Sequence, residues 1–300
     1  MRKSLLFMIA FALFSAVPVL AQERQEGPPP VLMIIREEIK PGMMGTHTRH
    51  AADFVGIFNQ LQTPNHRIAL VPVAGNENEV VYLTAAGSFA EVETTFKQTD
   101  KKMGSATGML KTRIDGLDKE APALHSAMRD MLAVYRPEMS FNPGVNIAQM
   151  RYFSVTTIRV RPGHDAQYVE SIQKLVNVAR AKAKVDDLHI AVYQIVSGAP
   201  GGTYLAFRPM KSLAEMDTAV GRRVREAMSD DQRKDADKAA NDAVMSTEVS
   251  TYAFAPNMSY VDKQFAAMDP TFWNPPQEQM AVKPKPRKRA PKAPAAPPAN

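Results

Sequence analysis

The sequence predicts an α+β fold made of two consecutive copies of one β-α-β-β-α-β unit. An extended run that ends in a basic residue and Pro-Gly occurs twice, at residues 31–42 and 152–163. A helical pattern follows each run, and further matching blocks follow in the same order in both halves. A long unit that is present only twice indicates a duplicated domain rather than a solenoid.

Four blocks of sequence keep the same order and nearly the same spacing in the two halves. The matched pairs are 41–42 with 162–163, 66–75 with 189–198, 81–93 with 203–217, and 135–141 with 254–260. Because these matches share one order and a near-constant offset, we expect two structurally equivalent halves. We place the repeats at 31–141 and 152–260, with a linker at 142–151.

The first part of each half predicts a strand followed by a helix. Residues 31–40 are rich in Ile, Val and Met, which favour a strand, and Pro41-Gly42 ends it. Side chains that can face a core then recur at helical spacing in both halves. These positions are His47, Ala51, Phe54, Val55 and Phe58 in the first half, and Tyr168, Ile172, Leu175, Val176 and Ala179 in the second.

The second part of each half predicts a β-hairpin, a capped helix and a last strand. Ser88 and Ser212 are predicted N-caps, each followed three residues later by Glu, which is the capping-box pattern. The next helical stretch of the first half is predicted to break near Gly104–Gly108. The predicted segments are hairpin strands at 66–73, 80–86, 189–196 and 203–208, helical stretches at 100–131 and 228–246, and last strands at about 132–137 and 248–256.

This order of elements is the ferredoxin-like plan. With the RVRPGH motif at 159–164, it resembles the dimeric α/β-barrel superfamily, which includes antibiotic-biosynthesis-monooxygenase-like and NIPSNAP-like domains. The resemblance covers about 31–141 and 152–260. It implies that two four-stranded sheets pack together and close a barrel around a cavity. Since both units lie on one chain, we expect an intramolecular pseudo-dimer, either monomeric or within a higher homo-oligomer. A sheet with helices on one face leaves its other face bare, and a second copy can cover it.

The N-terminus has the features of a signal peptide. Residues 1–21 begin with Arg2 and Lys3, continue as an apolar run and end in Val-Leu-Ala before Gln22. A permanent membrane anchor is the alternative, although the run is short for a span. The chain has no cysteine, so it carries no disulfide. We therefore expect a periplasmic or secreted protein after cleavage near Ala21.

The remaining flanks differ in composition from the repeats. Residues 22–30 are a polar, Pro-rich lead-in with no core to join, and we expect this lead-in to be disordered. We expect 261–274 to dock on the body. Residues 275–300 are rich in Pro, Ala and Lys/Arg, which predicts a disordered tail. This tail is either solubilising or an electrostatic contact to anionic envelope components.

The net charge of the chain comes from its ends. The whole chain carries +6, but residues 1–21 and 281–300 contain basic residues and no acidic ones. Residues 22–280 hold 29 basic and 31 acidic residues, so the body is near neutral. The composition therefore gives no reason to expect a nucleic-acid partner.

Histidines are the main candidates for a functional role. His47 and His50 lie three residues apart on one predicted helix and could share a metal ion. The sequence places no third ligand beside them. We therefore expect a half-buried His47 and an exposed His50. His66 and His189 occupy equivalent strand-start positions, as pocket groups or as partners of backbone carbonyls. His125 is expected to be exposed on the extension helix. The ligand-pocket candidates are His47, His66, Tyr168 and His189.

No motif in the sequence identifies a reaction. It contains no phosphate loop between a strand and a helix and no nucleophile elbow, so the catalytic residues are unknown and no cofactor or metal is expected. Haem-degrading members of the superfamily use an axial His with nearby Asn and Trp, but Trp273 lies outside both repeats. The leading hypothesis is a protein that binds a small molecule in a barrel cavity. The alternatives are a cofactor-free oxygenase- or isomerase-like enzyme and a structural, envelope-associated protein.

Overall fold

The computed structural model describes residues 27–274, and the eight strands in this range close into one antiparallel barrel. The strand order around it is β1-β3-β2-β8-β5-β7-β6-β4. The strands are β1 (Val31–Ile39), β2 (Ile68–Ala74), β3 (Glu79–Ala86), β4 (His125–Tyr135), β5 (Tyr152–Val160), β6 (Ala191–Ser197), β7 (Thr203–Met210) and β8 (Val244–Phe254). Each half supplies four adjacent strands in the same internal order, so the predicted pair of ferredoxin-like units and their pseudo-dimeric barrel are confirmed.

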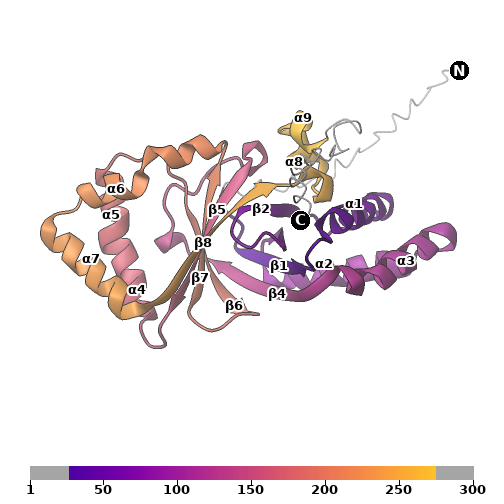
Figure 1. Ribbon diagram of the computed structural model, residues 1–300, viewed down its shortest axis with the longest axis horizontal. Helices are drawn as coiled ribbons and strands as arrows, with labels where there is room; N and C mark the ends of the chain where they lie inside the picture. The colour runs from indigo at the N-terminus through magenta and orange to yellow at the C-terminus, as the bar shows by residue number, and fades with distance from the viewer. Residues whose placement is uncertain (1–26, 275–300) are drawn as a thin grey trace, which may run out of the picture.

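Helices cover the barrel on two opposite sides, one side for each half (Figure 1). The first half supplies α1 (Met44–Leu61), α2 (Phe89–Gly104) and α3 (Gly108–Leu124). The second half supplies α4 (Asp165–Ser171), a π-helical turn (Ile172–Val176), α5 (Asn177–Lys182), α6 (Val220–Glu226) and α7 (Asp230–Ala243). As predicted, the first half breaks between Gly104 and Gly108, and Ser88 caps α2 by accepting the Glu91 N–H at 3.2 Å.

Short 3₁₀ turns connect several of these elements and keep the pseudo-symmetry of the halves. They lie at Pro137–Met139, Ile147–Gln149, Leu213–Thr218 and Pro256–Met258. The turns after β4 and β8 are equivalent, and each brings a fully buried methionine, Met139 or Met258, against the outer face of a sheet. The matched sequences 135–141 and 254–260 therefore form the same turn at equivalent places in the two halves.

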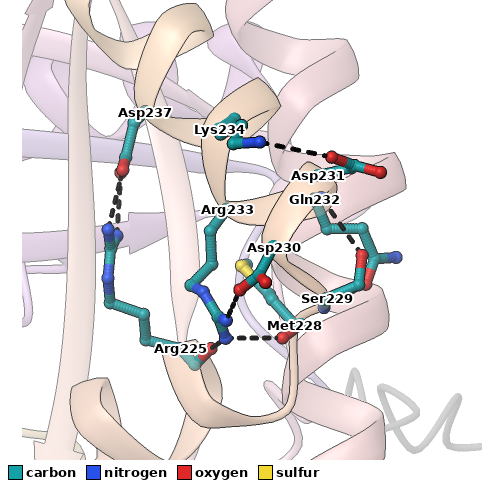
Figure 2. Close-up of polar contacts among 9 residues, drawn as sticks. All are labelled: Arg225, Met228, Ser229, Asp230, Asp231, Gln232, Arg233, Lys234 and Asp237. Atoms are coloured by element: carbon teal, nitrogen blue, oxygen red, sulfur yellow. Dashed lines mark hydrogen bonds and ion pairs between the residues drawn. The ribbon is translucent and has the colours of Figure 1, made fainter.

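Polar side chains hold the corner between α6 and α7 (Figure 2). Ser229 and Gln232 form a reciprocal capping box, in which Ser229 Oγ accepts the Gln232 N–H at 3.2 Å and Gln232 Oε1 accepts the Ser229 N–H at 3.0 Å. Arg225 of α6 donates two hydrogen bonds, of 2.8 and 2.7 Å, to the Asp237 carboxylate of α7. These contacts position a solvent-exposed corner and take no part in the core.

Alternation along the strands divides the apolar side chains between the barrel interior and the helix-covered outer face. The middle of the interior is filled by Ile34, Leu70, Val81, Met131, Val155 and Leu205. On the outer face of the first sheet, Tyr82 packs in a cluster with Ala51 of α1, and Tyr204 of the second sheet packs with Tyr168 of α4. Because each fully buried apolar side chain contributes about 1.5–3 kcal/mol, both faces of the sheet stabilise the fold.

The last strand of each half begins earlier than predicted. It starts at His125 rather than 132, and at Val244 rather than 248. The early residues of β4 are exposed and carry no apolar alternation, so nothing in their side chains signals a strand. They are extended because their backbone pairs with β1, where Arg36 lies opposite Arg129.

Segments outside the repeats close one end of the barrel. α8 (Lys263–Ala267) and α9 (Pro270–Trp273) fold back on this end, where the Trp273 indole donates to the Ala148 carbonyl at 2.8 Å. The expectation that the lead-in has no core to join is wrong for its described residues, since the Tyr193 hydroxyl donates to the Pro29 carbonyl at 3.0 Å. A short Pro-rich stretch can therefore join a core through its backbone carbonyls.

The predicted signal peptide and the predicted C-terminal tail lie outside the described residues. Within 27–274, no helix combines the length and the apolar character that a bilayer span requires.

The two halves are joined along two hydrogen-bonded seams, β2 with β8 and β4 with β6. Leu70 pairs with Phe254 in the first seam, and Tyr135 pairs with Tyr193 in the second. Each seam contains a register shift. Since these pairings remove the free edges of both sheets, the halves depend on one another.

A glycine lies beside each seam at equivalent positions of the two halves. Gly75 and Gly198 have φ angles of 127° and 89°, which other residues rarely adopt. A Cβ on Gly198 would lie 2.0 Å from the Asp130 carbonyl oxygen, and one on Gly75 would lie 2.8 Å from Ser250 Oγ. Glycine is required here because the opposite strand approaches closely.

We expect Gly198→Ala to lower the free energy of unfolding by about 3 kcal/mol, since a left-handed residue costs about 1–2 kcal/mol and overpacking about 1–3 kcal/mol. Gly201→Ala in the same hairpin is the matched control, because its Cβ would meet open space and its φ is not positive. Urea unfolding of both variants measures the difference. Equal stability of the two variants would show that the seam tolerates a side chain at Gly198.

Candidate functional site

An apolar cavity of about 220 Å³ lies inside the barrel at the end that α8 closes. Its wall consists of inward-facing strand residues, because interior positions recur at every second residue. These are Leu32, Leu83, Ala85, Phe153, Ala191, Tyr193, Phe207 and Pro209. Residues from outside the strands form its roof, among them Pro29, Val145, Ile147 and Phe265.

Tyr193 is the one polar side chain among the described residues that line this cavity. Its hydroxyl is already engaged with the Pro29 carbonyl, and burial followed by the neighbouring Tyr135 raises the pKa of Tyr193 well above its usual range. The phenol therefore stays protonated and acts as a fixed hydrogen-bond donor to the roof. The cavity consequently presents an almost entirely apolar surface.

The opposite end of the barrel interior is polar. The Arg36 side chain contacts Glu79 Oε1 at 2.8 Å through Nε and at 2.7 Å through Nη2, and the Tyr252 hydroxyl donates to Glu79 Oε2 at 2.5 Å. Burial, and then the hydrogen bond to Glu79, raise the pKa of Tyr252 to about 12. The apolar middle layer separates this network from the apolar cavity. The empty space between the middle layer and the network measures only about 20 Å³.

A third pocket, of about 150 Å³, lies outside the barrel between α2 and the first sheet. Three buried polar atoms of its lining residues make no hydrogen bond: Asn65 Oδ1, Arg67 Nε and Thr99 Oγ1. The Arg67 guanidinium lies 4.5 Å from the centre of the Tyr82 ring and 5.0 Å from that of Phe58. The two aromatic rings hold the guanidinium of Arg67 in place, while its Nε has no hydrogen-bond partner.

The structure does not bring the four sequence-predicted pocket residues together, and none of them lines the apolar cavity. His47 belongs to α1 and is buried against the first sheet, where its Nε2 donates to Glu37 Oε2 at 2.7 Å. Tyr168 packs on Tyr204, with the ring centres 5.6 Å apart, and burial raises the pKa of Tyr168 to about 12. His189 is half-buried and donates from Nδ1 to the Asn142 carbonyl at 2.7 Å.

His66 lies against the ring of Tyr260, with the ring centres 4.7 Å apart. Burial lowers the pKa of His66, and the nearby Asp262 opposes this shift only in part. His66 and His189 hold equivalent positions, as the bridges of Arg67 with Tyr260 and of Ile190 with Phe141 show. Both lie just before the strands whose next residues, Ile68 and Ile190–Ala191, line the apolar cavity.

Three expectations about histidine exposure were wrong. His47, expected to be half-buried, is fully buried, because its side chain lies between α1 and the first sheet. His50 is buried and donates from Nε2 to the Leu117 carbonyl at 2.9 Å, because α3 packs against α1 at this point. His125 is the first residue of β4, and only 10% of its side chain is exposed. His47 and His50 therefore face different partners and do not form a pair.

No pattern in the sequence indicates Arg67, Tyr193 or Tyr252 as site residues. In the sequence, Arg67 is a single basic residue at the start of a strand. The other wall of its pocket is formed by α2, which comes later in the chain. For Arg36 and Glu79 a signal exists, since both are charged residues at inward-facing strand positions. Charges at such positions are rarely buried unless they are paired.

Comparisons with known proteins find structural similarity at low sequence identity only. No family model matches the chain, and no curated protein matches it. Among solved structures, an anthrone oxidase-like protein is 13% identical, with a TM-score of 0.47, over 75% of this chain and 92% of its own. A chlorite dismutase variant from Candidatus Nitrospira defluvii is 10% identical, with a TM-score of 0.45, over 79% and 95%. A candidate monooxygenase from Lactobacillus acidophilus is 7% identical, with a TM-score of 0.42, over 75% and 94%.

Strand pairing establishes the fold independently of these similarities. The chain has the architecture of a dimeric α/β barrel, with both halves supplied by one polypeptide. Such low identities transfer no activity, so the function has to be inferred from the sites themselves.

Proposed function

We propose that the protein binds a small apolar molecule in the cavity at the α8 end of the barrel, without transforming it. The observation that supports this proposal is the lining: apolar side chains and one tyrosine whose hydroxyl already has a partner. An apolar ligand gains the hydrophobic free energy of about 25 cal/mol per Å² of buried surface and leaves no buried polar group unpaired.

The volume suggests the size of the ligand. An apolar cavity of about 150 Å³ accommodates benzene. At about 220 Å³, this cavity suits a molecule with one substituted ring or two small fused rings. Longer chains or large polycyclic molecules would require the roof to move.

The roof is the route by which a ligand enters. It is made of short segments held to the barrel by few polar contacts, including the Tyr193–Pro29 hydrogen bond and the ion pair of Arg151 with Asp269. Segments of this kind open at a lower free energy than strands do. Binding therefore requires no disruption of the strand pairing.

We expect bromobenzene to bind to the purified protein and to quench the fluorescence of Trp273, the only tryptophan. Trp273 contacts the roof residue Phe265, with ring centres 5.0 Å apart. Ala191→Leu should abolish the quenching, because the added side chain occupies the cavity, while keeping the thermal midpoint at or above that of the parent protein. Ala90→Leu on the exposed surface of α2 is the matched control. Quenching that survives in Ala191→Leu would contradict the proposal.

The pocket beneath α2 favours a second candidate, an enzyme of the cofactor-free oxygenase or isomerase type. A half-buried guanidinium whose buried Nε has no hydrogen-bond partner can stabilise an oxyanion or enolate, which both reaction types generate. Three unpartnered polar atoms are costly unless a ligand or water satisfies them. The described lining contains no carboxylate or imidazole that could act as a base, so this candidate stands second.

If this pocket takes an anionic group, benzoate should raise the thermal midpoint of the parent protein, and Arg67→Gln should remove the effect. Arg49→Gln on the exposed side of α1 is the control for lost charge. Thr99→Val, which keeps the shape of the side chain, should weaken the effect without altering the fold. A stabilisation that is equal in all variants would assign benzoate to another site.

We also propose that the protein is exported and that its basic tail contacts anionic envelope components, on the strength of residues 1–21 and 281–300. Mass spectrometry of the native protein should find Gln22 at the N-terminus. Deletion of 281–300 should weaken retention on phosphatidylglycerol vesicles, and salt should weaken retention of the full chain in the same way. An intact Met1 in the cytoplasm would refute export, and retention that is independent of the tail would refute the contact.

A further inference from the structure

Three potential metal ligands meet on the outer face of the first sheet, and none of them lines either pocket of the proposed function. Glu37 lies on β1, His47 on α1 and His125 at the start of β4. Glu37 Oε2 is 2.7 Å from His47 Nε2 and 3.3 Å from His125 Nε2. One ligand atom from each residue lies within 4.8 Å of the others.

The hydrogen bonds of His125 leave a lone pair aimed at this carboxylate. Its Nδ1 is 2.8 Å from the Ala121 carbonyl, which only accepts, so Nδ1 carries the hydrogen. In the neutral ring, Nε2 is then an acceptor that faces the acceptor Glu37 Oε2, and it makes no hydrogen bond. Two acceptors at 3.3 Å repel each other unless a cation lies between them or the ring takes up a second proton.

The cluster is buried but can be reached from solvent. The side chain of His47 is 2% exposed, whereas Glu37 and His125 are 12% and 10% exposed. His47 Nδ1 is also buried without a hydrogen-bond partner. Two of the four imidazole nitrogens of the cluster, His47 Nδ1 and His125 Nε2, therefore have no hydrogen-bond partner.

The second half shows that the fold does not require polar groups at these positions. By the strand register, His125 pairs with Ile39 as Val244 pairs with Val160. The positions equivalent to Glu37, His47 and His125 are thus Ile158, Tyr168 and Val244. These three belong to one apolar cluster beneath α4. In the second half, apolar packing alone fills these positions. Only the first half carries two imidazoles and a carboxylate there.

We propose that Glu37, His47 and His125 bind a divalent transition-metal ion such as Zn²⁺. Two imidazoles and one carboxylate are ligands that Zn²⁺, Fe²⁺ and Co²⁺ accept, whereas Mg²⁺ and Ca²⁺ prefer oxygen ligands alone. Three protein ligands leave a fourth position for water. The ion would join β1, α1 and the α3–β4 junction.

The separation of Glu37 and His125 already suits the ion, whereas His47 has to move. Bonds of about 2.0–2.1 Å in a tetrahedral site place ligand atoms about 3.3 Å apart. Glu37 Oε2 and His125 Nε2 already have this separation. His47 has to move away from Glu37 by about 0.6 Å and to shift its hydrogen from Nε2 to Nδ1, which keeps the ring neutral. The Ala121 carbonyl already orients His125, as carbonyls do for metal-bound histidines.

The test uses the full chain, free of any affinity tag and stripped of metal with a chelator. Calorimetric titration with Zn²⁺ should show one ion per chain and a raised thermal midpoint. Glu37→Gln and His125→Gln should each weaken the affinity by about 100-fold or more. His50→Gln, one turn away on the same helix, and His164→Gln on the surface are the controls and should retain the binding.

Co²⁺ provides a second measurement on the unsubstituted protein, which does not depend on whether any variant folds. A tetrahedral Co²⁺ absorption spectrum, together with nitrogen chemical shifts that report Nε2 coordination of His47 and His125, would support the site. Folded parent protein that takes up no Zn²⁺ would overturn it. So would affinity that is unchanged in the Glu37 and His125 variants, or coordination that involves other histidines. In those cases the cluster is an ion pair completed by a protonated His125.

Discussion

The closure of the barrel depends on each half completing the other's sheet. A four-stranded sheet alone would expose its β2 and β4 edges, or their β6 and β8 equivalents, together with a bare apolar face. Pairing of β2 with β8 and of β4 with β6 satisfies the backbone groups of these edges and buries the interior side chains at the same time. The interior core and the cavity are therefore built from residues of both halves, whereas each helix-covered face is built mostly within one half.

The closed barrel encloses two different environments. The apolar layer in its middle leaves a hydrophobic cavity at one end and the Arg36–Glu79–Tyr252 network at the other. Carboxylate and guanidinium are paired there, as charges in an interior must be. Segments outside the repeats roof only the apolar end. Equivalent residues of the two halves, such as Leu32 and Phe153, line the same end, so the pseudo-two-fold axis runs along the barrel and does not exchange its ends. The linker and the C-terminal helices add to this difference, because they belong to one end alone.

The sequence was sufficient to predict the architecture because the duplication doubled each local signal. Pro41-Gly42 with Pro162-Gly163, and the matched hairpins, located equivalent elements without knowledge of the three-dimensional contacts. The start of β4 was missed because backbone pairing with β1 determines it, while its side chains are polar and exposed. Local patterns therefore predicted elements where side chains determine the structure and missed them where pairing does.

The candidate sites were harder to predict because they are assembled from distant residues. His47 was singled out correctly as a core-facing histidine, but its partners are Glu37 and His125, and no spacing signals a cluster that spans a strand, a helix and a later strand. Arg67 and Tyr193 acquire their environments only when α2 and the lead-in pack on them. His189 matched His66 in sequence, yet His189 donates to the Asn142 carbonyl whereas His66 lies against the ring of Tyr260.

The seam between β2 and β8 also has a consequence for how the chain folds. It joins residues near the start of the body to residues near its end, as does the adjacent hydrogen bond from Tyr260 to the Thr63 carbonyl, which spans 197 positions of sequence. Contacts of such long range form slowly, because the intervening chain must lose its freedom first. During synthesis, the first sheet has to wait with an open edge until β8 has emerged. Folding is thus tied to completion of the polypeptide, and a truncated chain lacks the strand that would protect it from aggregation.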